Sequence, residues 1–158
     1  MSLKVLCFGE TQFLKRVVGK LKNESRESNE DEIVVDNLEI KGKPFLTFSI
    51  SNPELIGSQA TGTAGLIYFL DPSVPLYEQK EFFFTVIGER KEFEGIPAVI
   101  VYDKDQSTPY INAELNIKEI VNYFELFKVK DRASMIKEVD LDERDTITEI
   151  FGWIDTQV

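Results

Sequence analysis

The stretch LKVLCFGETQFLKR, residues 3–16, sets the first unit of the fold. Its first part, residues 3–8, is apolar at most positions, which is typical of a buried strand. Gly9 then marks a turn. Apolar residues recur behind it at the spacing of one helical face, and they are Phe13, Leu14, Val17, Val18 and Leu21. The stretch therefore predicts a strand, a glycine turn and a helix.

The rest of the chain alternates strands with helices after one early hairpin. The hairpin is expected over 33–40 and 45–50, with Leu46, Phe48 and Ile50 on one face. Later strands are expected over 65–70, 98–102 and 135–139, and helices over 76–92, from Asn116 onward, and over 147–154. This order predicts an α/β fold of three layers. We expect a mostly parallel six-stranded sheet with one antiparallel hairpin strand, in a single domain over residues 1–158.

Composition removes several classes of function. The formal charge is −10, so nucleic acid would be repelled and is not an expected partner. The chain has no histidine, which removes the commonest general base and zinc ligand. Cys7, the single cysteine, is expected in the core rather than as a nucleophile. The longest apolar run, 64–70, is far shorter than the roughly 20 residues of a membrane span, so we expect a soluble, cytoplasmic protein without a transmembrane segment.

The turn after the first strand has part of a phosphate-loop pattern. In G-x-x-x-x-G-K-[ST], backbone N–H groups hold phosphates, the lysine reaches the β and γ groups, and the hydroxyl binds Mg²⁺. Gly9 and Lys15 match this pattern, whereas Leu14 replaces the second glycine and Arg16 replaces the hydroxyl residue. The simpler interpretation is that Gly9 is a turn glycine and Lys15 a solvated helix residue.

Taken together, the strand-end turns resemble those of the small Ras-like GTPases, over nearly the whole chain. The run 65–71 is similar to the buried strand before that family's third helix, and 95–101 is similar to the run before its base-recognition motif N-K-x-D. The resemblance implies a phosphate-loop fold. It also places the family's nucleotide-binding positions at Gly9, Lys15, Arg16, Asp103 and Lys104.

The motifs that carry the family's chemistry are eroded in this chain. The D-x-x-G position reads N-P-E-L at 52–55, which lacks both the metal-linked aspartate and the glycine that senses γ-phosphate. At the N-K-x-D position Lys104 matches, but Asp103 replaces the asparagine and Gln106 replaces the guanine-binding aspartate. The resemblance is therefore to a degenerate member, and no cofactor is expected.

The chain keeps the order of elements of this family but lacks several of the family's nucleotide-binding groups. Two functions are compatible with that combination. The first is a catalytically inactive GTPase-like domain that binds another protein as a scaffold or regulatory subunit. Its contact surface is expected over 23–36 and 51–63, including Glu30, Asp36, Asn52 and Glu54. The resemblance implies a roadblock-type or longin-type partner, or a second copy of the chain. The second function is a divergent GTP or GDP switch with Mg²⁺, or a slow nucleoside triphosphatase, in which Lys15 holds phosphate and Arg16 replaces part of the metal's charge.

Two weaker alternatives concern aspartates. Asp71, Asp103 and Asp105 could form a carboxylate cluster for a metal, but each follows a strand, where aspartate is favoured for its local hydrogen bonds. Asp71 could also be the acceptor of a receiver-like signalling domain. The hairpin at 33–50 argues against that fold.

Overall fold

The computed structural model describes residues 2–22, 32–71, 74–88, 91–103 and 133–158. One six-stranded sheet runs through them in the order β2-β3-β1-β4-β5-β6, and only β2 is antiparallel to its neighbour. The strands are β1 (Leu3–Gly9), β2 (Ile33–Ile40), β3 (Lys43–Ile50), β4 (Thr63–Phe69), β5 (Ala98–Asp103) and β6 (Ser134–Val139). The predicted sheet, with its single antiparallel hairpin strand, is confirmed.

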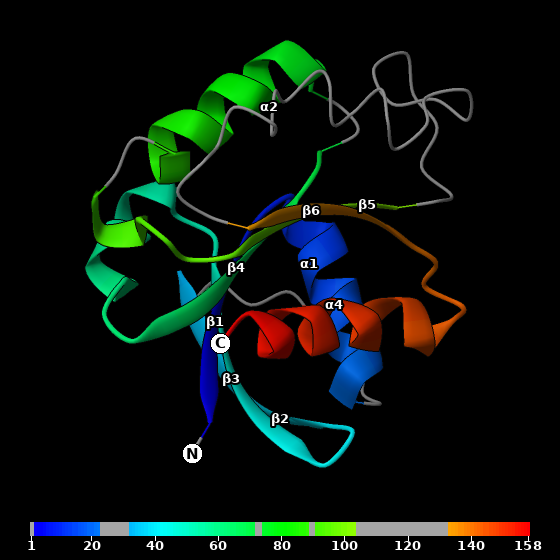
Figure 1. The fold of residues 1–158 in the computed structure, drawn as a ribbon. Coiled ribbons are helices and arrows are strands. Elements are labelled where there is room, and N and C mark those ends of the chain that lie inside the picture. The colour runs from blue at the N-terminus through cyan, green and yellow to red at the C-terminus, as the bar shows by residue number, and fades with distance from the viewer. Residues whose placement is uncertain (1, 23–31, 72–73, 89–90, 104–132) are drawn as a thin grey trace.

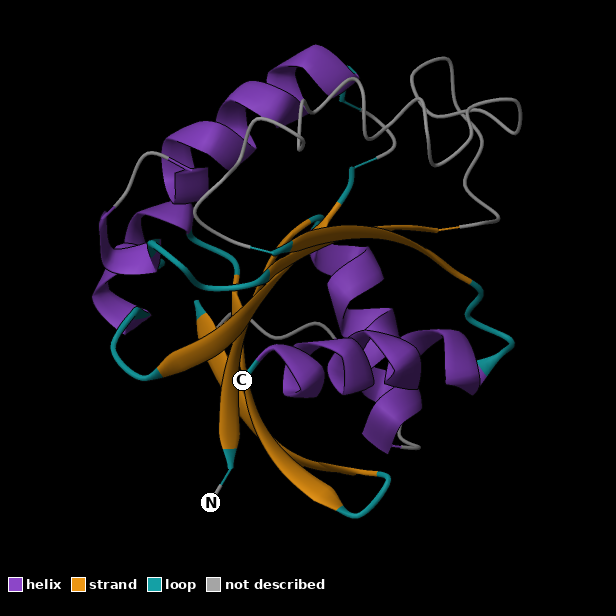
Figure 2. Cartoon of the chain, viewed as in Figure 1, coloured by secondary structure: helices purple, strands orange, loops and turns teal. Residues whose placement is uncertain are grey.

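Helices cover both faces of this sheet. Helices α1 (Thr11–Lys22) and α4 (Arg144–Gln157) lie on one face, and α2 (Leu76–Phe83) lies on the other (Figure 1). Each face has its own apolar core. The predicted arrangement of three layers is therefore present (Figure 2).

The faces of the helices follow from the apolar periodicity. All five apolar residues predicted for the first helix are buried in α1, and they are Phe13, Leu14, Val17, Val18 and Leu21. In α4 the buried positions Ile147, Ile150, Phe151 and Ile154 match the predicted inner face. Gly65 lets α4 approach the sheet closely, because a Cβ there would lie 2.7 Å from the Ile154 side chain.

Two features of the structure differ from the sequence prediction, and two predicted segments are not tested. The helix expected over 76–92 is α-helical only to Phe83 and widens into a π-helical turn over Phe84–Gly88 before a short 3-10 helix at Lys91–Phe93. The hairpin strand β3 buries both faces rather than one, since Phe45 and Ile50 enter opposite cores. The helix expected from Asn116 lies outside the described residues, as does most of the polar segment 23–32.

Candidate functional site

The carboxyl end of β1 turns sharply at Gly9. Its φ of +116° is a conformation that glycine adopts readily and other residues rarely adopt. A Cβ at this position would lie 2.3 Å from the Phe69 carbonyl oxygen. The next amide, Glu10 N–H, donates to that same carbonyl at 2.9 Å. Gly9 therefore joins the carboxyl ends of β1 and β4 by close backbone contact.

Helix α1 begins almost at once after this turn, because only Glu10 separates it from β1. The Glu10 carboxylate accepts hydrogen bonds from the backbone N–H of Gln12 at 3.0 Å and of Phe13 at 2.6 Å. An anionic side chain is stabilised at a helix N-terminus, where free N–H groups and the helix dipole present positive charge. Two amides that could hold a phosphate here are thus bound by the chain's own carboxylate.

Lys15 and Arg16 lie within α1 rather than at its first amides. The Arg16 Nε donates to the Gln12 carbonyl at 3.4 Å, and Nη2 lies 3.9 Å from Oδ2 of Asp103. Asp103 ends β5 and its side chain is 4% exposed. The structure therefore brings Arg16 of α1 next to Asp103 at the carboxyl end of β5. Lys104 lies outside the described residues.

A cavity of about 320 Å³ opens next to Glu10, at the carboxyl ends of β1 and β4 and against α2. Its lining residues are Gly9, Glu10, Tyr68, Asp71, Val74, Glu78, Gln79 and Phe82. Burial and the charge of Asp71 raise the pKa of Tyr68, so its hydroxyl stays protonated. The cavity therefore combines aromatic walls with carboxylates.

Gln79 organises this cavity and was missed by the sequence analysis. Its amide oxygen accepts from the Tyr68 hydroxyl at 3.2 Å and from the Asp71 N–H at 2.6 Å. Its amide nitrogen donates to the carbonyls of Asp71 at 2.7 Å and Val74 at 2.9 Å. The available signal was a glutamine on the side of α2 that also carries Phe83, four positions on.

The segment between β3 and β4 forms two short 3-10 helices, Pro53–Leu55 and Gly57–Gln59. The Asn52 side chain caps the first by accepting from the Glu54 N–H at 3.1 Å, and its amide donates to Glu32 at 3.2 Å. Ile56 anchors the segment in the core with no exposed surface. Glu54 is exposed, as a contact residue would need to be.

Asp36 is not on an exposed surface, which corrects its assignment as a candidate partner contact. It is 4% exposed, and its carboxylate lies 2.9 Å from the Lys22 ammonium at the end of α1. The residue alternates with the exposed positions of β2 and faces the core with Leu38 and Ile40. Of the other predicted contacts, Glu30 lies outside the described residues.

The remaining expectations concern metals and membranes. Within the described ranges no three acidic, histidine or cysteine side chains come close enough to hold a metal ion, and Asp105 lies outside those ranges. None of the described helices has the length and apolar character needed to span a membrane.

Cys7 is buried in β1, as predicted, and burial raises the pKa of its thiol to about 12.

Comparison with known proteins places the fold. No family model matches the sequence, and no curated protein matches it. Among solved structures, an Arl6 (BBS3) small GTPase from Trypanosoma brucei, with the bound nucleotide analogue GppNp, superposes with a TM-score of 0.79 over 99% of this chain and 96% of that one. The chain has the fold of a small GTPase. Sequence identity to that protein is 15%, a level at which the likeness extends to the fold alone.

Proposed function

We propose that this chain is a GTPase-like domain that neither binds nor hydrolyses nucleotide and that acts as a protein-binding scaffold or regulatory subunit. The observation that carries the proposal is the Glu10 carboxylate, which accepts from the amides of Gln12 and Phe13 at the start of α1. A phosphate at that position would have to displace a bound carboxylate and then share its surroundings with the same negative charge.

The neighbouring residues support the same proposal. Leu14 is 4% exposed and packs in the core, so its position is filled by a side chain instead of offering bare backbone. Arg16 stands where the resemblance requires a hydroxyl for Mg²⁺, and its guanidinium lies near Asp103. A cation at this position opposes the binding of a second cation.

The segment 51–63 supports a role in protein binding. Lys4 donates to the carbonyls of Gln59 at 2.5 Å and Thr61 at 2.9 Å, and Ile56 is buried beneath the segment. These contacts hold residues 56–61 of the segment against the sheet. A preformed surface is better suited to constitutive binding than to a nucleotide-dependent switch. A roadblock-type or longin-type domain, or a second copy of this chain, is the partner class that we propose for it.

Isothermal titration with GTP and with GDP, each with and without Mg²⁺, tests the loss of nucleotide binding. We expect no saturable heat in any of the four titrations. Binding at micromolar or lower concentration that depends on Mg²⁺ would contradict the proposal and favour the divergent switch. In that case Lys15→Ala should abolish binding, whereas Lys20→Ala, an exposed lysine on the same helix, should not.

A further inference from the structure

The cavity beside Glu10 has an aromatic side formed by Tyr68 and Phe82. Their ring centroids lie 5.8 Å apart with planes tilted by 36°. The ring of Phe8 also packs against Tyr68, with 5.3 Å between the two ring centroids. Tyr68 belongs to the buried core, whereas Phe82 is partly exposed. An incoming group would therefore meet ring surfaces that are fixed by the core.

Hydrogen bonds fix another part of the cavity lining. The four hydrogen bonds of Gln79 fix the Tyr68 hydroxyl, the backbone of Asp71 and the carbonyl of Val74 in one arrangement. Gln79 is itself 2% exposed. Because these groups bond to one another, the cavity is formed before any ligand enters, and little ordering would accompany binding.

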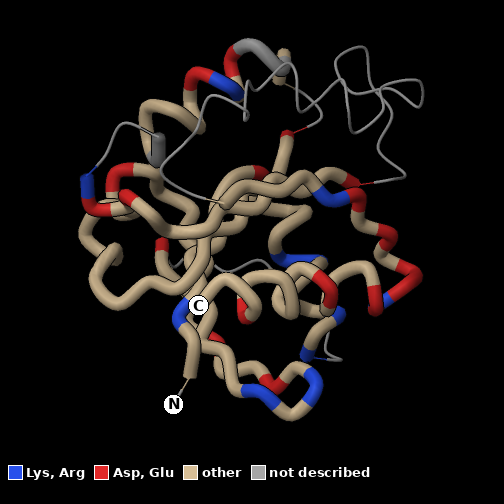
Figure 3. Tube along the Cα trace, in the orientation of Figure 1, with Lys and Arg blue, Asp and Glu red and all other residues tan. Residues whose placement is uncertain are grey.

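The charge of the cavity is negative. Glu10, Asp71 and Glu78 contribute to its lining, and no lysine or arginine among the described residues does so. The whole chain adds to this field with its formal charge of −10. In Figure 3 the acidic residues are spread over the molecule, so an approaching cation is attracted from many directions.

The charge and size of the cavity favour some kinds of ligand over others. Phosphates and other anions would meet three carboxylates. The carboxylates do not converge as metal ligands do within the described residues. The volume of about 320 Å³ is near the lower end of ligand pockets, roughly 300–1,000 Å³, which suits a single side chain better than a nucleotide. A cation with a flat or alkyl body can stack on aromatic rings and pair with carboxylates at once.

We propose that this cavity receives one basic side chain, arginine or lysine, from a partner protein. The inference rests on the proposed function, since it names the chemistry of the partner that the scaffold binds. Glu78 is exposed on α2 at the rim and pairs with the incoming cation. The partly exposed ring of Phe82 stacks on the cation, and the buried ring of Tyr68 packs against Phe82.

Titration of ¹⁵N-labelled protein with N-acetyl-arginine amide, followed by NMR, tests this proposal. The probe should shift the backbone signals of Glu10, Asp71 and Glu78 in a saturable way at millimolar concentration. N-acetyl-citrulline amide, which has the same shape without the charge, should not. Glu78→Gln should weaken the binding of the arginine probe about threefold, as expected for a partly exposed ion pair.

Glu81→Gln is the matched control, because Glu81 is exposed on the same helix but does not line the cavity. It makes the same change in net charge and should leave binding unaltered. A lack of saturable shifts, an equal response to citrulline, or equal weakening in both variants would overturn the proposal. If the protein bound neither nucleotide nor the arginine probe, the proposed scaffold role would be kept and the proposed role of this cavity would be rejected. Nucleotide binding together with an arginine response would remove the scaffold role and keep the cavity site.

Discussion

Gly9 leaves no room for a side chain at the end of β1. Gly9→Ala would place a Cβ 2.3 Å from the Phe69 carbonyl oxygen at a φ of +116°, so we expect the free energy of unfolding to fall by about 3 kcal/mol or more. Gly42→Ala is the control, because Gly42 also has a positive φ but open space around it, and it should cost about 1 kcal/mol. Equal losses in urea denaturation would show that the contact with Phe69 is not the cause.

Glu10 gives a second test of the same turn. Glu10→Ala removes the acceptor for the amides of Gln12 and Phe13, so the protein should lose about 1 kcal/mol of stability, as other helix caps do. Glu94→Ala, an exposed glutamate outside the caps, should change stability by less than about 0.5 kcal/mol. An unchanged midpoint of denaturation for Glu10→Ala would contradict the role of this carboxylate as a cap.

The thiol of Cys7 makes stability depend on alkaline pH. Burial, with a smaller contribution from the charge of Asp36, raises the pKa of the thiol from its ordinary value of 9.0 to about 12. Above the ordinary pKa the unfolded chain loses the thiol proton while the native chain keeps it, so stability falls as pH rises. Between about pH 8 and about pH 10 the native protein should lose about 1.5 kcal/mol more than Cys7→Val does. If stability plotted against pH fell equally in the native protein and in Cys7→Val, the prediction would be contradicted.

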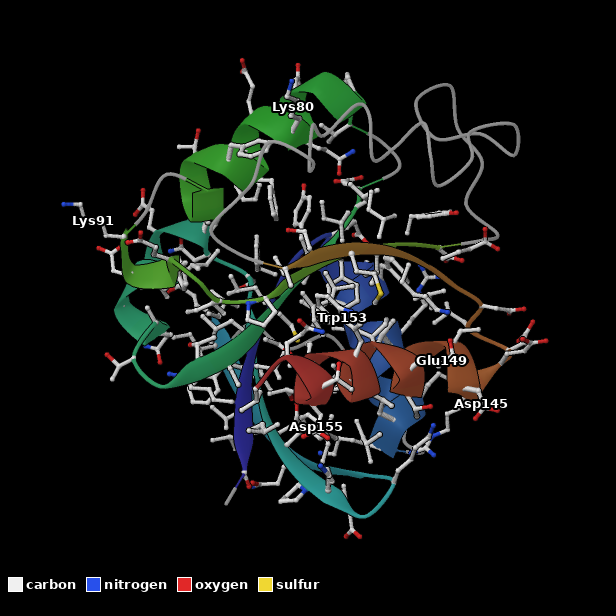
Figure 4. The ribbon with its side chains drawn as sticks, in the orientation of Figure 1. Lys80, Lys91, Asp145, Glu149, Trp153 and Asp155 are labelled. Carbon is white, nitrogen blue, oxygen red and sulfur yellow. The ribbon has the colours of Figure 1, made fainter. Side chains whose placement is uncertain are left out.

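At the scale of elements, a partly buried ion pair joins α1 to the hairpin. Lys22 and Asp36 lie 2.9 Å apart, and their side chains are 28% and 4% exposed. Asp36→Asn removes the negative charge that lies beside the partly buried Lys22 ammonium, so we expect the free energy of unfolding to fall by roughly 2–4 kcal/mol. The control is Asp155→Asn on α4, labelled in Figure 4, whose partner Lys43 is 60% exposed. Chemical denaturation should show a loss below about 1 kcal/mol there.

The hydrogen bonds of Lys4 should protect the segment between β3 and β4 from hydrogen exchange. Lys4→Met removes the ammonium group, and with it the hydrogen bonds to the Gln59 and Thr61 carbonyls and the cation lying 4.7 Å from the centroid of the Phe48 ring. Hydrogen exchange over 57–63 should become roughly tenfold faster, while exchange in β5 stays unchanged. Lys41→Met, in the exposed hairpin turn, is the control. Unaltered exchange in Lys4→Met would mean that other contacts fix the segment.

The sequence predicts some elements far better than others, for physical reasons. Strands β1, β4 and β5 are apolar runs because both their faces are buried, and such runs can be recognised locally. The early end of α2 was missed, because its apolar residues continue into the π-helical turn. The burial of Asp36 was missed although it alternates in phase with Leu38 and Ile40. Its partner Lys22 is supplied by another element and is visible only after folding.

At the scale of the whole molecule, the order of motifs predicted the small-GTPase fold, but not how the phosphate-loop segment folds. Glu10 follows the turn glycine, and glutamate is not among the preferred capping residues, so its capping of α1 could not be foreseen. The cavity and its Gln79 network need β4, α2 and the turn between them to be assembled. Fold therefore follows from local patterns here, whereas the candidate site depends on contacts between elements.

The central claim is that this small-GTPase fold is used without a nucleotide. The most direct measurement is the nucleotide content of the purified protein, released by heat and separated by chromatography against GTP and GDP standards. We predict far less than one nucleotide per chain, also after incubation with excess GTP and Mg²⁺ followed by desalting. Close to one guanine nucleotide per chain would contradict the account.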